Sequence, residues 1–274
     1  MTTHFKGPVS GAKTAWAGGG ADVPIDAISH DDWVVYHNDF IHFADYDATN
    51  DWTLTQVSAG GSAAINALPT LPNGVLVLDC PANLDGPIVQ FDKNRMHYLA
   101  AASSATVVAT ETVFACRFSV LDVSTSSVFV GLAESESGGT GNVLTTPTAG
   151  TTSDTHIGFV SNNVLAGAFT ATAAGSVDTT AVTTAGVFTL TDGDWIDVAV
   201  RAVGQTEAHF YYRPVGRSAD SRRTRRDWIE LPTLTTTEAW DASMFPTFAV
   251  LGAAAGDDLY IDRIVWAVKR DLTI

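Results

Sequence analysis

The stretch Glu111-Thr-Val-Phe-Ala-Cys-Arg-Phe-Ser-Val120 decides the fold class. Its side chains divide into two sets. Thr112, Phe114, Cys116, Phe118 and Val120 fall on one side of an extended chain, and Glu111, Arg117 and Ser119 fall on the other. Because successive side chains of a strand point to opposite faces of a sheet, this stretch predicts a β-strand with one apolar, buried face.

Similar stretches recur along the chain, separated by turns rich in Gly, Thr, Ser, Asn and Asp, with almost no helical periodicity. They predict strands at residues 40–43, 52–57, 74–79, 127–133, 156–160, 164–170, 195–202, 207–213, 247–251 and 259–268. Residues 195–202 and 207–213 form a predicted hairpin with Gly204 in its turn. The last stretch is apolar at nearly every position, which is typical of a strand in the middle of a sheet.

We therefore predict an all-β protein, an antiparallel β-sandwich made by a single domain over residues 31–274. Long surface loops are expected near residues 135–154, 171–186 and 213–227; for the first two, weak edge strands are the alternative. Residues 1–30 are rich in Gly and poor in large apolar side chains, so they cannot close a core of their own. We expect either a disordered terminus or an extended arm that becomes ordered on another subunit, with Phe5 and Trp16 as anchors.

The charge of the chain limits its partners. A formal net charge of -15 argues against general binding to nucleic acid or to an anionic membrane. The start of the chain lacks the charged and apolar regions of a secretory signal, so we expect synthesis in a cytoplasm without a signal peptide. Cys80 and Cys116 lie in apolar stretches and are expected to be buried free thiols, with one cross-strand disulfide as the alternative.

Two acidic segments are candidates for ion sites. Residues 45–51 have the spacing of the start of a calcium loop, but Asn50 and Gln56 stand where Gly and Glu are expected. We expect a solvated turn there, with calcium binding as the alternative. Asp257, Asp258 and Asp262 are expected to form a polar turn that enters a strand, with an ion site as the alternative.

The sequence also predicts no catalytic residue. Glu134 and Glu136 have the spacing of a carboxylate pair for glycoside hydrolysis, but their Ser/Gly surroundings would not raise the pKa of an acid. The seven histidines show no metal-ligand spacing, and no Gly-x-Ser-x-Gly motif is present. We therefore expect a chain that is not an enzyme and that needs neither a cofactor nor a metal.

A basic segment stands out in this acidic chain. Arg213, Arg217, Arg222, Arg223, Arg225 and Arg226 are six of the fifteen Lys and Arg residues. Guanidinium groups bind carboxylates through paired hydrogen bonds, so we predict a docking patch for an acidic surface, with a solvated hairpin loop as the alternative. Nucleic acid is a third, weaker choice: Tyr211, Tyr212 and Trp228 would stack bases, but the net charge opposes it.

Two resemblances add to this interpretation. The opening Met1-Thr-Thr-His-Phe-Lys-Gly-Pro-Val9 resembles the start of virion structural proteins of tailed bacteriophages. The stretches Asp194-Trp-Ile-Asp-Val-Ala-Val-Arg201, 208–212 and Leu259-Tyr-Ile-Asp-Arg-Ile-Val-Trp266 resemble concanavalin-type jelly rolls. Legume lectins, laminin G-like modules and some glucanases share that sandwich, and the similarity covers about residues 40–270.

Together the resemblances imply a capsid decoration or cement protein on the outer surface of the head, with the major capsid protein as partner and a homo-oligomeric state. Phe5, Trp16 and the six arginines would then contact the capsid or other subunits. A glycan-binding or host-attachment module is the alternative, and a degenerate polysaccharide-degrading enzyme is the third. The Glu-x-Asp-x-x-Glu motif of the glucanases is absent, so their activity is not carried over.

Overall fold

The computed structural model describes residues 33–38, 52–58, 70–71, 74–80, 85–91, 111–134, 143–144, 155–162, 164, 166–175, 181–215, 228–237, 240 and 244–269. All regular elements in these ranges are strands, and none of these residues belongs to a helix that could cross a membrane. The predicted arm 1–30, the predicted strand 40–43 and the acidic segment 45–51 lie outside the described residues.

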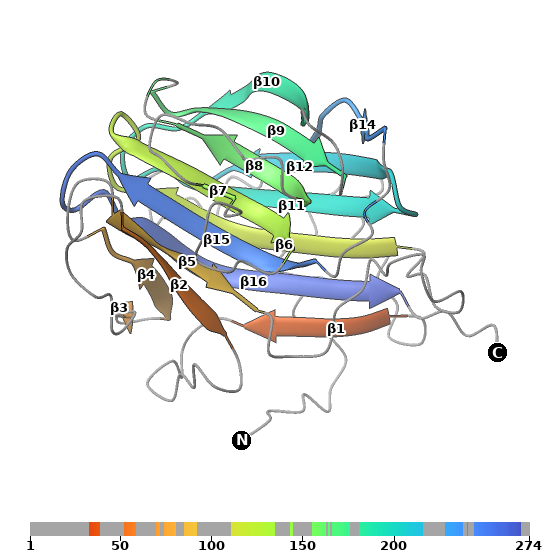
Figure 1. The fold of residues 1–274 in the computed structure, drawn as a ribbon, viewed down its shortest axis with the longest axis horizontal. Coiled ribbons are helices and arrows are strands. Elements are labelled where there is room, and N and C mark those ends of the chain that lie inside the picture. The colour runs from red at the N-terminus through yellow and green to blue at the C-terminus, as the bar shows by residue number, and fades with distance from the viewer. Residues whose placement is uncertain are drawn as a thin grey trace.

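The strands form two antiparallel sheets (Figure 1). Sheet A has nine strands, with the order β13 (Ile229–Glu230), β12 (Glu207–Pro214), β11 (Trp195–Val203), β6 (Glu111–Val120), β16 (Leu259–Lys269), β4 (Val75–Leu78) and β3 (Thr70–Leu71). In addition, β1 (Trp33–Asn38) pairs with β16, and β14 (Leu234–Thr235) pairs with β12. Sheet B has seven strands: β10 (Val182–Thr189), β9 (Ala168–Ala174), β8 (His156–Ser161), β7 (Ser126–Ala133), β15 (Phe245–Gly252), β5 (Asp85–Gln90) and β2 (Thr53–Ser58). The prediction of an all-β, concanavalin-like sandwich is confirmed.

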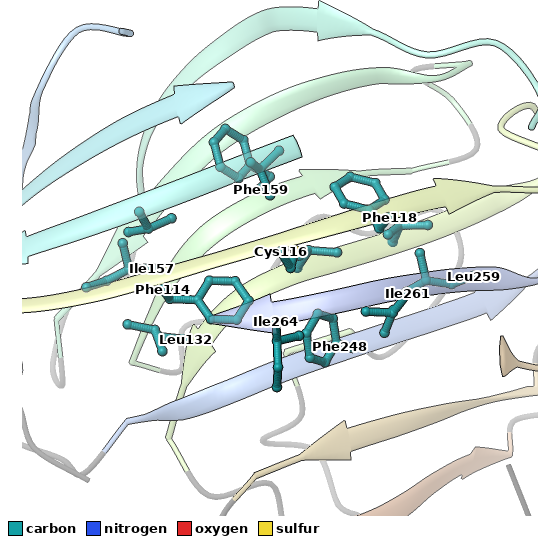
Figure 2. Close-up of a cluster of buried hydrophobic side chains, with 14 of the residues drawn as sticks. Phe114, Cys116, Phe118, Leu132, Ile157, Phe159, Phe248, Leu259, Ile261 and Ile264 are labelled. Carbon is teal, nitrogen blue, oxygen red and sulfur yellow. The ribbon is translucent and has the colours of Figure 1, made fainter. Parts of the chain in front are cut away.

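The main core lies between the two sheets. Phe114, Cys116 and Phe118 of β6 are fully buried there, as their alternation predicted (Figure 2). The other face of β6 is buried too, except at Arg117, so the prediction of a single buried face is wrong. The rings of Phe114 and Phe248 lie 5.8 Å apart between centroids and join sheet A to sheet B. A second ring contact between the sheets, Phe159 to Phe210 at 5.4 Å, meets edge to face, which aromatic pairs favour.

The predicted hairpin and the predicted central strand are both present. In the β11–β12 hairpin Val198 lies opposite Tyr212 and Val200 opposite Phe210. Gly204 in its turn has a φ of 60°, which glycine adopts without strain. Strand β16 pairs with β6 on one side and with β4 and β1 on the other, which explains its nearly continuous apolar sequence.

The prediction of a surface loop at residues 171–186 is wrong for most of that range. Residues 171–174 belong to β9 and residues 182–186 belong to β10. The predicted strand at 164–170 begins late, because Ala166 and Gly167 have φ of 45° and 82° and form a turn. Strand β10 is the edge of sheet B and has one neighbour, so most of its side chains are not buried and its periodicity is weak. The edge-strand alternative holds for residues 182–186 of β10, whereas residues 171–174 of β9 are buried between β8 and β10.

Both cysteines are buried and free, as predicted. Cys116 packs in the main core, and Cys80 lies just after β4. Burial raises the pKa of both thiols above the ordinary range. The thiolate, which is the reactive form, is therefore disfavoured at both positions.

Candidate functional site

A row of charged side chains crosses the outer face of sheet A. Asp197 of β11 lies opposite Arg213 of β12 and Arg117 of β6, and Arg117 lies opposite Arg263 of β16. The residues next to Asp197 along β11 are core residues, so alternation turns Asp197 to the other face. We call Arg213, Asp197, Arg117 and Arg263, together with Asp262, the arginine row.

Asp197 is the centre of the row and is fully buried. Arg117 donates from Nε to Oδ1 at 2.7 Å and from Nη2 to Oδ2 at 3.2 Å. Arg213 donates from Nε and Nη2 to Oδ2, at 3.0 and 2.6 Å. Nη2 of Arg263 lies 3.8 Å from Oδ1. These hydrogen bonds compensate the cost of burying the carboxylate, and they fix the positions of the guanidinium groups.

The side of the row near β16 reaches the surface. The side chains of Arg117, Arg263 and Asp262 are 24%, 17% and 33% exposed, and Nη1 of Arg117 lies 3.4 Å from Oδ2 of Asp262. Burial alone would lower the pKa of Arg117, but its hydrogen bond to Asp197 and the charge of that group raise it. For Arg263, burial and then the charge of Arg117 lower the pKa below its usual value. The row thus holds three guanidinium groups close together around one buried carboxylate.

Aromatic side chains lie beside the row. On β6, Ser119 pairs with Trp195 of β11 on one side and with Tyr260 of β16 on the other. Trp195 and Tyr260 are both half-buried. Since neighbouring strands are about 4.8 Å apart, the backbones that carry the two aromatic residues stand about 10 Å apart across the small Ser119.

A second cluster on this face surrounds Trp228. Its ring centroid lies 4.8 Å from Cζ of Arg213, and it belongs to an apolar cluster with Ala115, Ala199 and Tyr211. Burial and then the charge of Glu230 raise the pKa of Tyr211 to about 12. Trp228 therefore supports the arginine row from the β12 side.

A polar network continues beyond Tyr211 on the same face of sheet A. Arg201 forms an ion pair with Glu111. His209 contacts Glu207 through Nε2 at 2.6 Å and Thr233 through Nδ1 at 3.2 Å. Polar groups able to bind hydroxyls thus extend along the sheet from the arginine row.

Of the residues predicted to contact a capsid or another subunit, the structure describes Arg213 alone. It is buried. Within the row it donates hydrogen bonds to Asp197, and beside the row it packs over the ring of Trp228. Phe5, Trp16, Arg217, Arg222, Arg223, Arg225 and Arg226 lie outside the described residues.

The other candidates form structural contacts where they are described. The backbone N–H of Glu134 donates to Thr155 O and its carbonyl accepts from Gln90, whereas Glu136 lies outside the described residues. Asp257 accepts from Thr125 Oγ1 at 2.8 Å and from the N–H of Ala254 at 3.0 Å, so it holds the predicted turn before β16.

Sequence reasoning missed the arginine row as a unit. The signal was present in part, because alternation places Arg117 and Asp197 on the outward faces of their predicted strands. Their pairing, and the approach of Arg263, depend on the order of strands in sheet A.

No protein-family model matches the chain, and no curated protein matches it. A protein of unknown function from Shewanella oneidensis MR-1 shares the fold, with a TM-score of 0.53, 15% identity and coverage of 100% of this chain and 99% of that one. So does the CBM2 module of the evolved Dit of Lactobacillus casei BL23 phage J-1, at TM-score 0.50, 15% identity and coverage of 88% and 98%. A Bacteroides ovatus GH16 protein in complex with a G4G4G3G product gives TM-score 0.51, 9% identity and coverage of 84% and 98%.

At these identities the comparisons show a shared jelly-roll fold. They correct the expectation that the chain is not an enzyme, because a glycoside hydrolase with a bound product has the same fold. They do not support the capsid-cement function, since the phage neighbour is a carbohydrate-binding module.

Proposed function

We propose that this chain is a glycan-binding module of a bacteriophage virion and that it binds glycan on the outer face of sheet A. The observation that carries the proposal is the adjacency of Trp195 and Tyr260 to the arginine row. Sugar rings present apolar C–H faces that pack on aromatic rings, and their hydroxyls need hydrogen-bonding groups close by. This face offers aromatic rings and hydrogen-bonding groups close together. The rings of Trp195 and Tyr260 flank Ser119, and the guanidinium group of Arg117 lies two residues away along β6.

The residues of the proposed site belong to regular strands, and this favours the site as a binding surface. Strands β11, β6 and β16 are neighbours within sheet A, and the core packs against their other face. Binding sites on such elements are held more precisely than sites on loops. A glycan would therefore meet guanidinium groups whose positions are already fixed by Asp197.

The phage setting of the proposal draws on the shared fold of the phage J-1 module. It also draws on the resemblance of residues 1–9 to phage virion proteins. In this proposal the arm 1–30 and the arginines from Arg217 to Arg226 attach the module to the virion, with a virion protein as partner. The sheet A face would then be available to a glycan of the host surface.

A glycan array with the purified chain tests the proposal, together with Trp195→Ala and Tyr260→Ala. We expect binding by the intact chain and loss of at least about tenfold in affinity for each variant, as for aromatic anchors of an interface. Val164→Ala is the matched control, because Val164 is 73% exposed in the turn between β8 and β9. An array with no bound glycan would refute the function, and unchanged binding by both aromatic variants would refute the site.

Cleavage of the bound glycan is a second candidate function, favoured by the fold shared with the product-bound GH16 protein. A reducing-end assay on each glycan bound in the array measures it. Release of reducing ends with enzyme-like turnover would show that the chain hydrolyses the glycan that it binds. Glycan recovered intact after prolonged incubation would refute hydrolysis and leave binding as the function.

A further inference from the structure

We infer that the glycan bound at this face carries a free amino group, which Asp79 and Asp258 hold as an ammonium ion. This inference rests on the proposed glycan-binding function and names the ligand class of the same site. It follows from an apolar patch at the end of sheet A where β6 ends and from two carboxyl groups at the rim of that patch.

The first step is the apolar patch. Trp195 and Tyr260 flank Ser119, and Leu121 directly follows β6. The N–H of Leu121 donates to the carbonyl oxygen of Asp258 at 2.9 Å, so Leu121 lies beside the start of β16. Leu121 is 42% exposed, and both aromatic side chains are half-buried. Exposed apolar side chains that gather inside a polar rim mark a binding surface.

The second step is the carboxyl pair at the rim. Leu78 at the end of β4 pairs with Leu259 of β16, so the register places Asp79 opposite Asp258. The side chains of Asp79 and Asp258 are in hydrogen-bond contact. The hydroxyl of Tyr260 lies 3.5 Å from Oδ2 of Asp258. Asp79 is exposed and Asp258 is half-buried, so a ligand packed on Tyr260 has access to both carboxyl groups.

The third step is the charge of this pair. Like charges directly opposite each other in a sheet repel. Burial raises the pKa of Asp258, and the charge of Asp79 adds to this effect. In the described part of the chain the other polar contacts of Asp258 are the N–H of Cys80 and the hydroxyl of Tyr260, and neither is a cation. A cationic ligand group would therefore stabilise the ionised pair.

The fourth step is the match to an ammonium group. Two carboxyl groups share a hydrogen bond only while one of them keeps its proton, whereas an ammonium group has three donors and serves two carboxylates at once. Asp258 and Tyr260 are two residues apart, about 7 Å along an extended chain. A sugar ring packed on Tyr260 would thus bring a ring substituent to Asp258. The guanidinium group of Arg117 is bound to Asp197 and lies two residues beyond Ser119 on the other side.

The test uses the intact chain at about pH 6, where an amine keeps its proton. Oligosaccharides that carry free amino groups are compared with their N-acetylated forms on one array. N-acetylation removes the charge and leaves the rest of the sugar unchanged. We expect the free-amine form to bind about tenfold more tightly, since charge-assisted contacts contribute on that scale.

Two variants locate the contact. Asp79→Asn and Asp258→Asn should each lower the affinity for the free-amine glycan several-fold and leave the affinity for the N-acetylated form unchanged. An Asn at position 258 still offers an oxygen to the N–H of Cys80, and thermal melts check that both variants fold. Asp122→Asn is the matched control for net charge, because the Asp122 carboxylate accepts from Ser124 within its own turn.

The outcomes separate this inference from the function on which it rests. N-acetylated glycans bound as tightly as their free-amine forms would overturn the amino-sugar specificity and keep glycan binding. Equal losses in Asp122→Asn and in the two pair variants would assign the effect to net charge and overturn the role of the pair. An array without any bound glycan would overturn both the inference and the proposed function.

Discussion

Asp197 and Arg117 form a bidentate ion pair across the β11–β6 ladder, with Nε to Oδ1 at 2.7 Å and Nη2 to Oδ2 at 3.2 Å. The carboxylate is fully buried, while the guanidinium group is partly exposed. One acidic residue therefore holds together the arginine row beside which the proposed binding site lies, and its removal is the most direct test of that arrangement.

Replacement of Asp197 by Ala should destabilise the fold strongly, because three guanidinium groups would be left with Asp262 as the carboxylate of the row. Breaking a buried ion pair by removing one partner costs about 3–5 kcal/mol. Urea unfolding followed by tryptophan fluorescence measures the loss. Asp262→Asn is the control and should change stability by less than about 1 kcal/mol, because its ion pair with Arg117 is long and partly exposed. Equal effects of the two variants would contradict this description.

Gly131→Ala should destabilise sheet B. A Cβ at Gly131 would lie 2.2 Å from the carbonyl oxygen of Ile157, and that oxygen belongs to the backbone of the neighbouring strand β8. Overpacking of a core typically costs about 1–3 kcal/mol, and a backbone clash stands at the upper end of that range.

The control for Gly131 is Gly193→Ala. Gly193 has a φ of 73°, and a Cβ added there would meet nothing within 4 Å. The free energy of unfolding of this variant should therefore fall by only about 1 kcal/mol, because of backbone strain. Thermal denaturation of both variants provides the measurement. A Gly131→Ala protein as stable as Gly193→Ala would show that the two strands are not packed as closely as described.

The stability of the protein should fall between about pH 9 and pH 10. Burial raises the pKa of Cys80 and Cys116 in the folded state, whereas an unfolded thiol has a pKa of about 8.5. Above that pH the unfolded chain releases protons that the folded chain keeps, so the free energy of unfolding falls by up to about 1.4 kcal/mol per pH unit for each thiol.

Urea titrations at a series of pH values measure this slope. Cys116→Ala is less stable at every pH because it leaves a small cavity, but its slope should be shallower than that of the intact chain. An identical slope in the two proteins would refute the role of the Cys116 thiol.

Trp228→Ala should lower the free energy of unfolding by about 3–5 kcal/mol, the range found for large-to-small substitutions of buried aromatic residues. The variant removes the ring next to Arg213 and opens the cluster around Ala115 and Ala199. Ile229→Ala, one residue further on, is the control, because Ile229 is 43% exposed and should change stability by less than about 0.5 kcal/mol. Calorimetric melting of the two variants tests the difference.

The sequence by itself determined the local features of the sandwich. Alternation with period two predicted which side chains of β6 enter the core, and it predicted the β11–β12 hairpin around Gly204. The continuous apolar run of β16 predicted a central strand. These features depend on residues that are near one another in the chain, and so a sequence pattern reports them directly. The edge strand β10 escaped a firm prediction because an edge needs less burial and thus shows less pattern.

The tertiary structure alone decided the candidate site. Arg117 is 80 residues from Asp197 and 145 residues from Asp262 in the sequence, and the order β12–β11–β6–β16 brings them together. Arg263 joins them only because a bulge reverses the alternation that its position in β16 would predict. Alternation fixes the face on which a side chain lies, whereas strand order, register and bulges are set by packing between distant segments, and these determine which charges meet.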